Sequence, residues 1–265
     1  ELKSGNAAAG TSGGIGFATG ASNSGIAGSI SVVAGESSKG TGADILVSAG
    51  DSSSNTGGNV VFQSGSSLIG VGGSISVESS GSTSTQSGNV RIASGDATSK
   101  SGGVSISSGS AGSGSAGEIV VQGGSTNSGV GGGIVFALGS SDNTGGSMKI
   151  QTGQSTQSMS GGIDFASDNS QFGSGEILLQ TGSATAGISG SIKLETGDSI
   201  SNSGDVSIIS GASFDSVGGS VQLNAGSSDT ATGGSISISS GRGATTTGSI
   251  TISSADSLSK SGSLR

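Results

Sequence analysis

The chain has 265 residues, 56 of them Gly; Gly and Ser together make up nearly half of the sequence, and Leu, Ile, Val and Phe about a fifth. A net charge of −8 with only nine basic residues excludes the basic surface that nucleic-acid binding needs, and no apolar run is long enough to predict a membrane span. Without Cys there are no disulfides or thiolate metal sites, and the lack of Pro and the periodic apolar residues argue against disorder.

A unit of 14 or 15 residues repeats about eighteen times, and we number each unit from position 0, the first large apolar residue after a Gly. These anchor residues are Ile15, Ile30, Ile45, Val60, Ile75, Val90, Val104, Ile119, Ile134, Met148, Ile163, Ile177, Ile192, Val206, Val221, Ile236, Ile250 and Leu264. Position +2 is apolar in every unit from Phe17 to Ile252. Apolar residues two apart, with mostly polar residues between them, predict a strand with one buried face.

Small residues and glycines bracket each predicted strand. Position +4 is mostly small, as in Thr19 and Ala34, position +5 is Gly in most units, and position −2 is Gly at every anchor except Ile45, which has Ala43 there. Glycine suits corners where φ is positive or where the backbone packs too closely for a Cβ. We therefore expect chain corners at both ends of each strand.

The pattern predicts an all-β fold: a parallel β-solenoid (β-helix) of about eighteen coils, with two thin facing sheets and Gly at the corners. Two buried apolar side chains stabilise a coil by roughly 3–6 kcal/mol, whereas ordering its backbone costs at least ~15 kcal/mol. Hydrogen bonding and stacking between coils must therefore supply the difference. The alternatives are an antiparallel meander, whose turns would be unusually long for hairpins, and a disordered chain.

The repeat continues to both ends of the sequence. Residues 1–5 fit positions +1 to +5 of a unit, and residues 262–265 stop just inside the next predicted strand. We therefore expect residues 1–265 to form one continuous solenoid array, as a segment of a longer chain or of a filament that grows end to end.

Residues for catalysis and for metal binding are scarce. The sequence has no His, Cys, Trp or Tyr, which removes most nucleophile–base pairs and most transition-metal sites. Asp51, Asp96 and Asp198 share position +6, but Ser replaces them in other units, so turn residues are favoured over calcium ligands. The Gly-rich stretch 109–114 lacks the Gly-Lys-Ser/Thr of a phosphate-binding loop. We predict no catalytic, cofactor-binding or metal-binding residue and no enzyme activity.

Two roles remain open for the Ser and Thr residues. A flat second wall rich in Ser and Thr predicts an ice-binding or carbohydrate-binding surface, comparable with insect antifreeze solenoids of 15-residue coils. The outward row at position +1 is too irregular for a repeated Thr-x-Thr face, since it includes Leu46, Arg91 and Asp164. Ser and Thr are also candidate acceptors for O-linked glycans, whereas no Asn begins an N-glycosylation sequon.

Two segments, 102–109 with sequence GGVSISSG and 234–241 with sequence GSISISSG, illustrate the repeat. They resemble the Ser/Gly-rich repeats of very large secreted proteins of diatoms and related algae and, more loosely, the stalks of bacterial surface adhesins. This resemblance implies an extracellular or cell-surface structural rod or filament with a fibre, spacer or adhesive role. We accordingly expect self-association, head to tail or lateral, as its partner interaction, with no nucleic acid, no membrane span and no cofactor.

Overall fold

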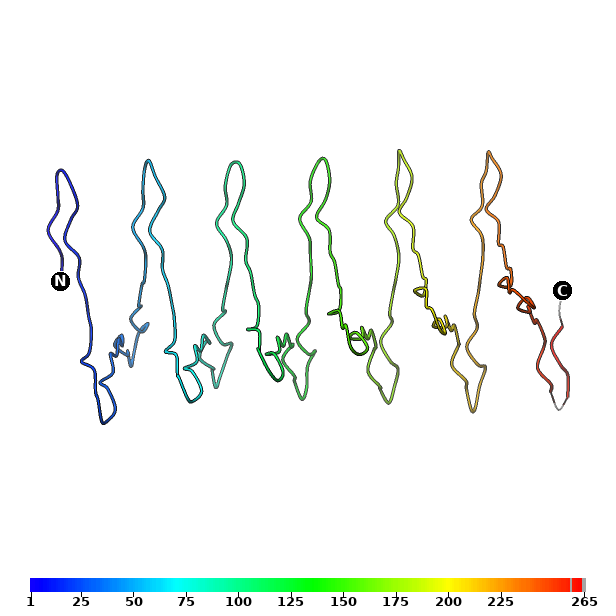
Figure 1. Cartoon of the computed structure of the whole chain (residues 1–265), viewed down its shortest axis with the longest axis horizontal. Coiled ribbons are helices and arrows are strands. Elements are labelled where there is room, and N and C mark those ends of the chain that lie inside the picture. Colours follow the sequence, from blue (N-terminus) through cyan, green and yellow to red (C-terminus); the bar gives the residue numbers. More distant parts are fainter. Residues whose placement is uncertain (258, 264–265) are drawn as a thin grey trace. The chain divides into compact units, whose positions relative to one another are not determined.

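The computed structural model describes residues 1–257 and 259–263 of the chain. The last predicted anchor, Leu264, lies outside the described residues, as does the final residue of the terminal segment 262–265. Figure 1 traces the chain and shows neither coiled ribbons nor arrows.

The described residues contain no helix and no strand, so there are no element bounds to give. The prediction of a parallel β-solenoid with two facing sheets is therefore wrong, and the meander of paired strands is not formed either. What recurs in the structure is the repeat itself, because the chain bends at the same place in successive units, at 23–25, 38–40, 53–55, 68–70 and 83–85.

Each repeat unit has two parts, which we call the extended segment and the loop. The extended segment runs from position −1 to position +4, and the loop runs from position +5 to position −2 of the next unit. In Figure 1 the trace turns back sharply at the loops. Residues 44–49 and 50–58 are one extended segment and the loop that follows it.

The loops are held by hydroxyl groups at position +7. In the loop 65–73, the Gly70 N–H donates to Ser67 Oγ at 2.8 Å. The same bond, from the backbone N–H at position +10 to the Ser hydroxyl at +7, occurs from Gly25 to Ser22 at 3.0 Å and from Asn55 to Ser52 at 2.9 Å. Ser and Thr hydroxyls commonly stabilise turns through such local bonds.

In eight loops of the described chain a backbone hydrogen bond closes the loop at its base, which we call the neck. The Gly58 N–H donates to Gly50 O at 2.9 Å, so positions −2 and +5 meet across the loop. The same bond joins Gly73 to Gly65 at 2.8 Å and Gly219 to Gly211 at 2.9 Å. The other neck bonds run from Ala43 to Gly35, Gly132 to Gly124, Gly146 to Gly139, Gly234 to Gly226 and Gly248 to Gly241.

The neck explains the Gly at position −2. A Cβ at Gly219 would lie 3.1 Å from Ser210 Cβ and 3.3 Å from Gly211 O, closer than ordinary van der Waals contact. Ala43 is the exception at this position, and its neck bond is the longest, at 3.1 Å. Close packing is thus the reason for Gly at position −2 in most loops with a neck bond, whereas a Cβ at Gly13, Gly88 or Gly204 would make only ordinary contact, at 3.6 to 3.8 Å. Positive φ is not the reason, since it occurs in the described residues only at Gly10 and Gly114.

The chain forms no hydrophobic core within the described residues. The most covered residues are Ala34, Ala49, Gly123 and Thr152, which all lie at position +4 and are still only partly buried. The anchors at position 0 keep 47–59% of their surface exposed, and the apolar residues at position +2 keep 55–74%. The dry seam expected between stacked coils is therefore absent.

The local hydrogen bonds give a physical reason for this correction. In a solenoid the second half of each unit would offer its backbone groups to the coils above and below it. Here the loop uses them itself, through the hydroxyl at position +7 and the neck bond. Side-chain bonds of this kind compete with regular secondary structure, so the loop does not become a second wall.

By its internal contacts the chain divides into two parts, Glu1–Phe136 and Ala137–Arg265. The division falls inside the extended segment that begins near Ile134, and the same loop and neck geometry occurs in both parts.

Candidate interaction surface

The described residues contain no pocket and no cluster of acidic side chains that could hold a metal ion. Asp51, Asp96 and Asp198, which share position +6, are not brought together into such a cluster. The described chain also offers no helix with the length and hydropathy for a bilayer crossing. A candidate site must therefore be sought on the exposed surface.

Extended backbone places alternate side chains on opposite sides of each extended segment. The ion pair between Lys193 Nζ and Glu195 Oε2, at 2.5 Å, joins positions +1 and +3. The hydrogen bond from Ser76 Oγ to Glu78 Oε1, at 3.2 Å, joins the same two positions in another unit. Positions +1 and +3 therefore share one face, and positions 0, +2 and +4 share the other.

The face made by positions 0, +2 and +4, which we call the apolar face, carries no charge in any described unit. Positions 0 and +2 are apolar throughout from Ile15 to Ile252, and position +4 is Ala, Gly, Ser, Thr or Leu. The charged residues of the extended segments lie at other positions. At −1 these are Asp44, Glu118, Glu176 and Asp205; at +1 they are Glu1, Arg91, Lys149, Asp164 and Lys193; at +3 they are Lys3, Glu78 and Glu195.

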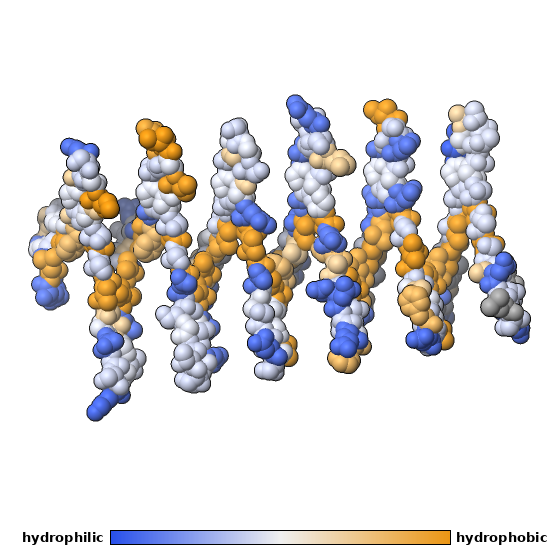
Figure 2. Space-filling model, turned by 90° about the horizontal axis from the view of Figure 1, so that it is seen from below, coloured by the Kyte–Doolittle hydropathy of each residue, from blue (hydrophilic) through white to orange (hydrophobic). Residues whose placement is uncertain are grey.

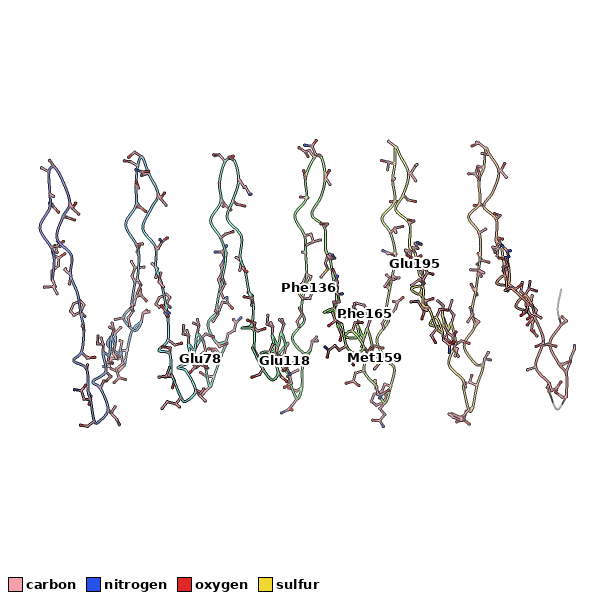
Figure 3. All side chains as sticks on the ribbon, viewed as in Figure 1. Glu78, Glu118, Phe136, Met159, Phe165 and Glu195 are labelled. Atoms are coloured by element: carbon pink, nitrogen blue, oxygen red, sulfur yellow. The ribbon has the colours of Figure 1, made fainter. Side chains whose placement is uncertain are left out.

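The pictures show both parts of the repeat. Figure 2 shows orange, apolar atoms at many places in the described chain, next to white and blue ones. Figure 3 labels Phe136 and Phe165, which occupy position +2 of extended segments, and Met159, which lies in a loop.

Some loops also expose apolar side chains, but none of their positions is apolar in every unit. Ile69 and Phe172, both at position +9, and Phe214 at +8 are essentially fully exposed. Six further exposed apolar residues share position +11, namely Ile26, Val71, Val130, Met159, Ile188 and Val217, but most loops have a polar residue or Gly there. The apolar face is therefore the surface that recurs in every unit.

The flat Ser/Thr wall of the ice-binding or carbohydrate-binding alternative does not form in the described residues. It required the second sheet of the solenoid, and the second half of each unit is a loop instead. Several of its hydroxyls accept hydrogen bonds from their own loop, as Ser213 does from the Ser216 N–H at 3.0 Å. Such hydroxyls face their own backbone and do not line up in a flat array.

Sequence reasoning found the rows at positions 0 and +2 but missed the role of position +7. The signal was present, because Ser22, Ser37, Ser52, Ser67 and Ser82 recur at that position in consecutive units. A hydroxyl residue three positions before a backbone donor predicts a local turn bond. Comparisons of the chain with protein families, with curated proteins and with solved structures find no match.

Proposed function

We propose that the chain is a non-catalytic structural protein of the cell surface or the extracellular matrix, where copies of it assemble into fibrous or adhesive material. One observation carries this proposal: the apolar face stays about half exposed in unit after unit. A repeated apolar surface without charge is stable in water only when something of similar extent covers it.

The total exposed area supports an assembled state. The chain exposes 26284 Å². A compact monomer of 24.5 kDa would expose about 10,000 Å². The excess is about 16,000 Å², whereas a stable protein interface needs about 1,600 Å² in total. One chain therefore carries ample surface for several contacts.

Composition supports a structural rather than a catalytic role. The sequence lacks His, Cys and Tyr, which are common acid–base and nucleophilic residues, and its carboxylates are scattered over different units. The resemblance to the Ser/Gly-rich repeats of secreted algal proteins suggests the extracellular location. The exposed hydroxyls that make no loop bond are the candidate acceptors for O-linked glycans.

The test combines assembly with location. The purified full chain is concentrated stepwise and examined by electron microscopy, where we expect fibres or sheets of uniform width. An antibody against the chain is applied to intact cells of its source, where we expect surface or matrix labelling. A chain that stays monomeric at every concentration, or labelling confined to the cell interior, would contradict the proposal.

A further inference from the structure

Units of 14 and 15 residues differ in the loop and not in the extended segment. The neck bond spans eight residues between Gly50 and Gly58, at 2.9 Å, but seven between Gly139 and Gly146, at 2.9 Å. A second short loop closes between Gly241 and Gly248 at 3.0 Å. In these two loops the loop absorbs the missing residue, so the neck and the apolar face next to it keep the same form.

The backbone of the extended segments makes no backbone-to-backbone hydrogen bond in the described residues, although Ala49 O accepts a hydrogen bond from Ser48 Oγ at 3.2 Å. Among the described residues, backbone-to-backbone hydrogen bonds join only neck positions. Each extended segment therefore presents free N–H and C=O groups together with its apolar face. Extended backbone in this state is a template for pairing with another chain.

From these two features we propose that the apolar face is the contact surface between copies of this chain, which pair at any whole-unit offset so that assembly is open-ended. The inference rests on the proposed function and names the partner and the surface. Because every unit presents the same charge-free face, no single alignment of two copies is preferred over one shifted by a unit.

A second copy fits this surface better than a lipid bilayer does. A bilayer would accept the side chains at positions 0 and +2, but it offers no partner to the backbone N–H and C=O groups, each of which costs several kcal/mol when buried in hydrocarbon. Charged residues such as Arg91, Asp164 and Lys193 lie one position from the apolar face. Another copy beside an extended segment can pair with its backbone at the edge, while a copy facing it covers positions 0 and +2, and both arrangements leave these charges in water.

Adjacent valines allow a test with two variants of identical composition, mass and net charge. Val60 and Val121 lie on the apolar face at positions 0 and +2, and their neighbours Val61 and Val120 lie on the opposite face at position +1. Val120 and Val121 have nearly equal exposure, 68% and 64%. The face variant is Val60→Asp with Val121→Asp, and the control is Val61→Asp with Val120→Asp.

The full-length wild type and both variants are compared by sedimentation velocity and light scattering over a concentration series. We expect the wild type and the control to form a broad series of sizes that grows with concentration. The face variant must bury charge in the contact, so it should need at least about ten-fold higher concentration to assemble. Matching amide NMR spectra of the two variants show that the loops are equally intact.

Results other than these would contradict the contact surface, the open-ended pairing or self-association itself. Equal loss, or no loss, in both variants overturns the apolar face as the contact surface and leaves the proposed function standing. A wild type that stops at one discrete dimer overturns open-ended pairing. A wild type that stays monomeric overturns both proposals, and one that binds phosphatidylcholine vesicles without self-associating replaces the second copy with lipid.

Discussion

Of the two parts of a repeat unit, the loop is the more variable in length and sequence, and it is nevertheless the part that satisfies its own hydrogen bonds. The loop 65–73 has both the bond to Ser67 Oγ and the neck bond from Gly73 to Gly65. The extended segment keeps an almost constant pattern, yet its apolar side chains and its backbone lack partners in the chain. This contrast between a self-bonded loop and an uncovered extended segment is the reason we propose contacts between copies at the extended segment.

The six Phe residues give the most direct test of this difference between extended segments and loops, because some of them lie in each part. Phe136 and Phe165 are in extended segments (Figure 3), and Phe172 and Phe214 are in loops. We expect Phe136→Ser with Phe165→Ser to weaken assembly roughly a hundred-fold, because burying two rings contributes about 3 kcal/mol or more. The isomeric variant Phe172→Ser with Phe214→Ser should assemble like the wild type, as measured by sedimentation velocity.

Exposure alone predicts the opposite order. Phe172 and Phe214 are 96% and 101% exposed, whereas Phe136 and Phe165 are 70% and 69% exposed. If the loop variant loses assembly and the extended-segment variant keeps it, isolated exposed rings, and not the repeated apolar face, hold the copies together.

The neck provides a second test of the difference between loop and extended segment. Here we expect a smaller effect, on the hydrogen bonding of one loop. Gly219→Val would place its side chain against Ser210 Cβ and Gly211 O, so the 2.9 Å neck bond should break at a cost of about 1 kcal/mol. The temperature dependence of the residue 219 amide proton shift measures this bond. Gly211→Val is the control, because a Cβ at Gly211 meets no atom within 4 Å. An equal response from both variants would mean that close packing does not determine Gly at position −2.

The smallest effect is expected at the loop hydroxyl. Ser67→Ala removes the acceptor of the 2.8 Å bond from Gly70 N–H, which should loosen this loop by about 0.5 kcal/mol and leave assembly unchanged. The readout is the temperature dependence of the Gly70 amide proton shift. The neighbouring Ser66→Ala should not alter it, because no described hydrogen bond involves Ser66. A Ser67→Ala variant that assembles poorly would show that loop and extended segment are not independent.

Several local features of the fold were predictable from the sequence. The unit length, the apolar rows and the Gly at position −2 all follow from spacing, and the close approach at Gly219 is one of the two reasons that spacing suggests for such a glycine. The solenoid was not correctly predicted, because apolar residues two apart indicate extended backbone with two faces but do not say which other segment covers them. For the same reason the residues of the apolar face were identified from the sequence, but the prediction that they are buried is wrong, because the structure leaves them exposed.

By itself, the sequence determines where the chain extends, where it bends and which side of each extended segment is free of charge, because these depend on residues a few positions apart. Only the tertiary structure decides where the backbone hydrogen bonds go. In the second half of each unit, the same Ser and Gly residues can pair with the next coil or close on themselves. Here they close on themselves, since the hydroxyl at position +7 and the neck glycine meet their partners within one loop, at no cost in ordering distant parts of the chain.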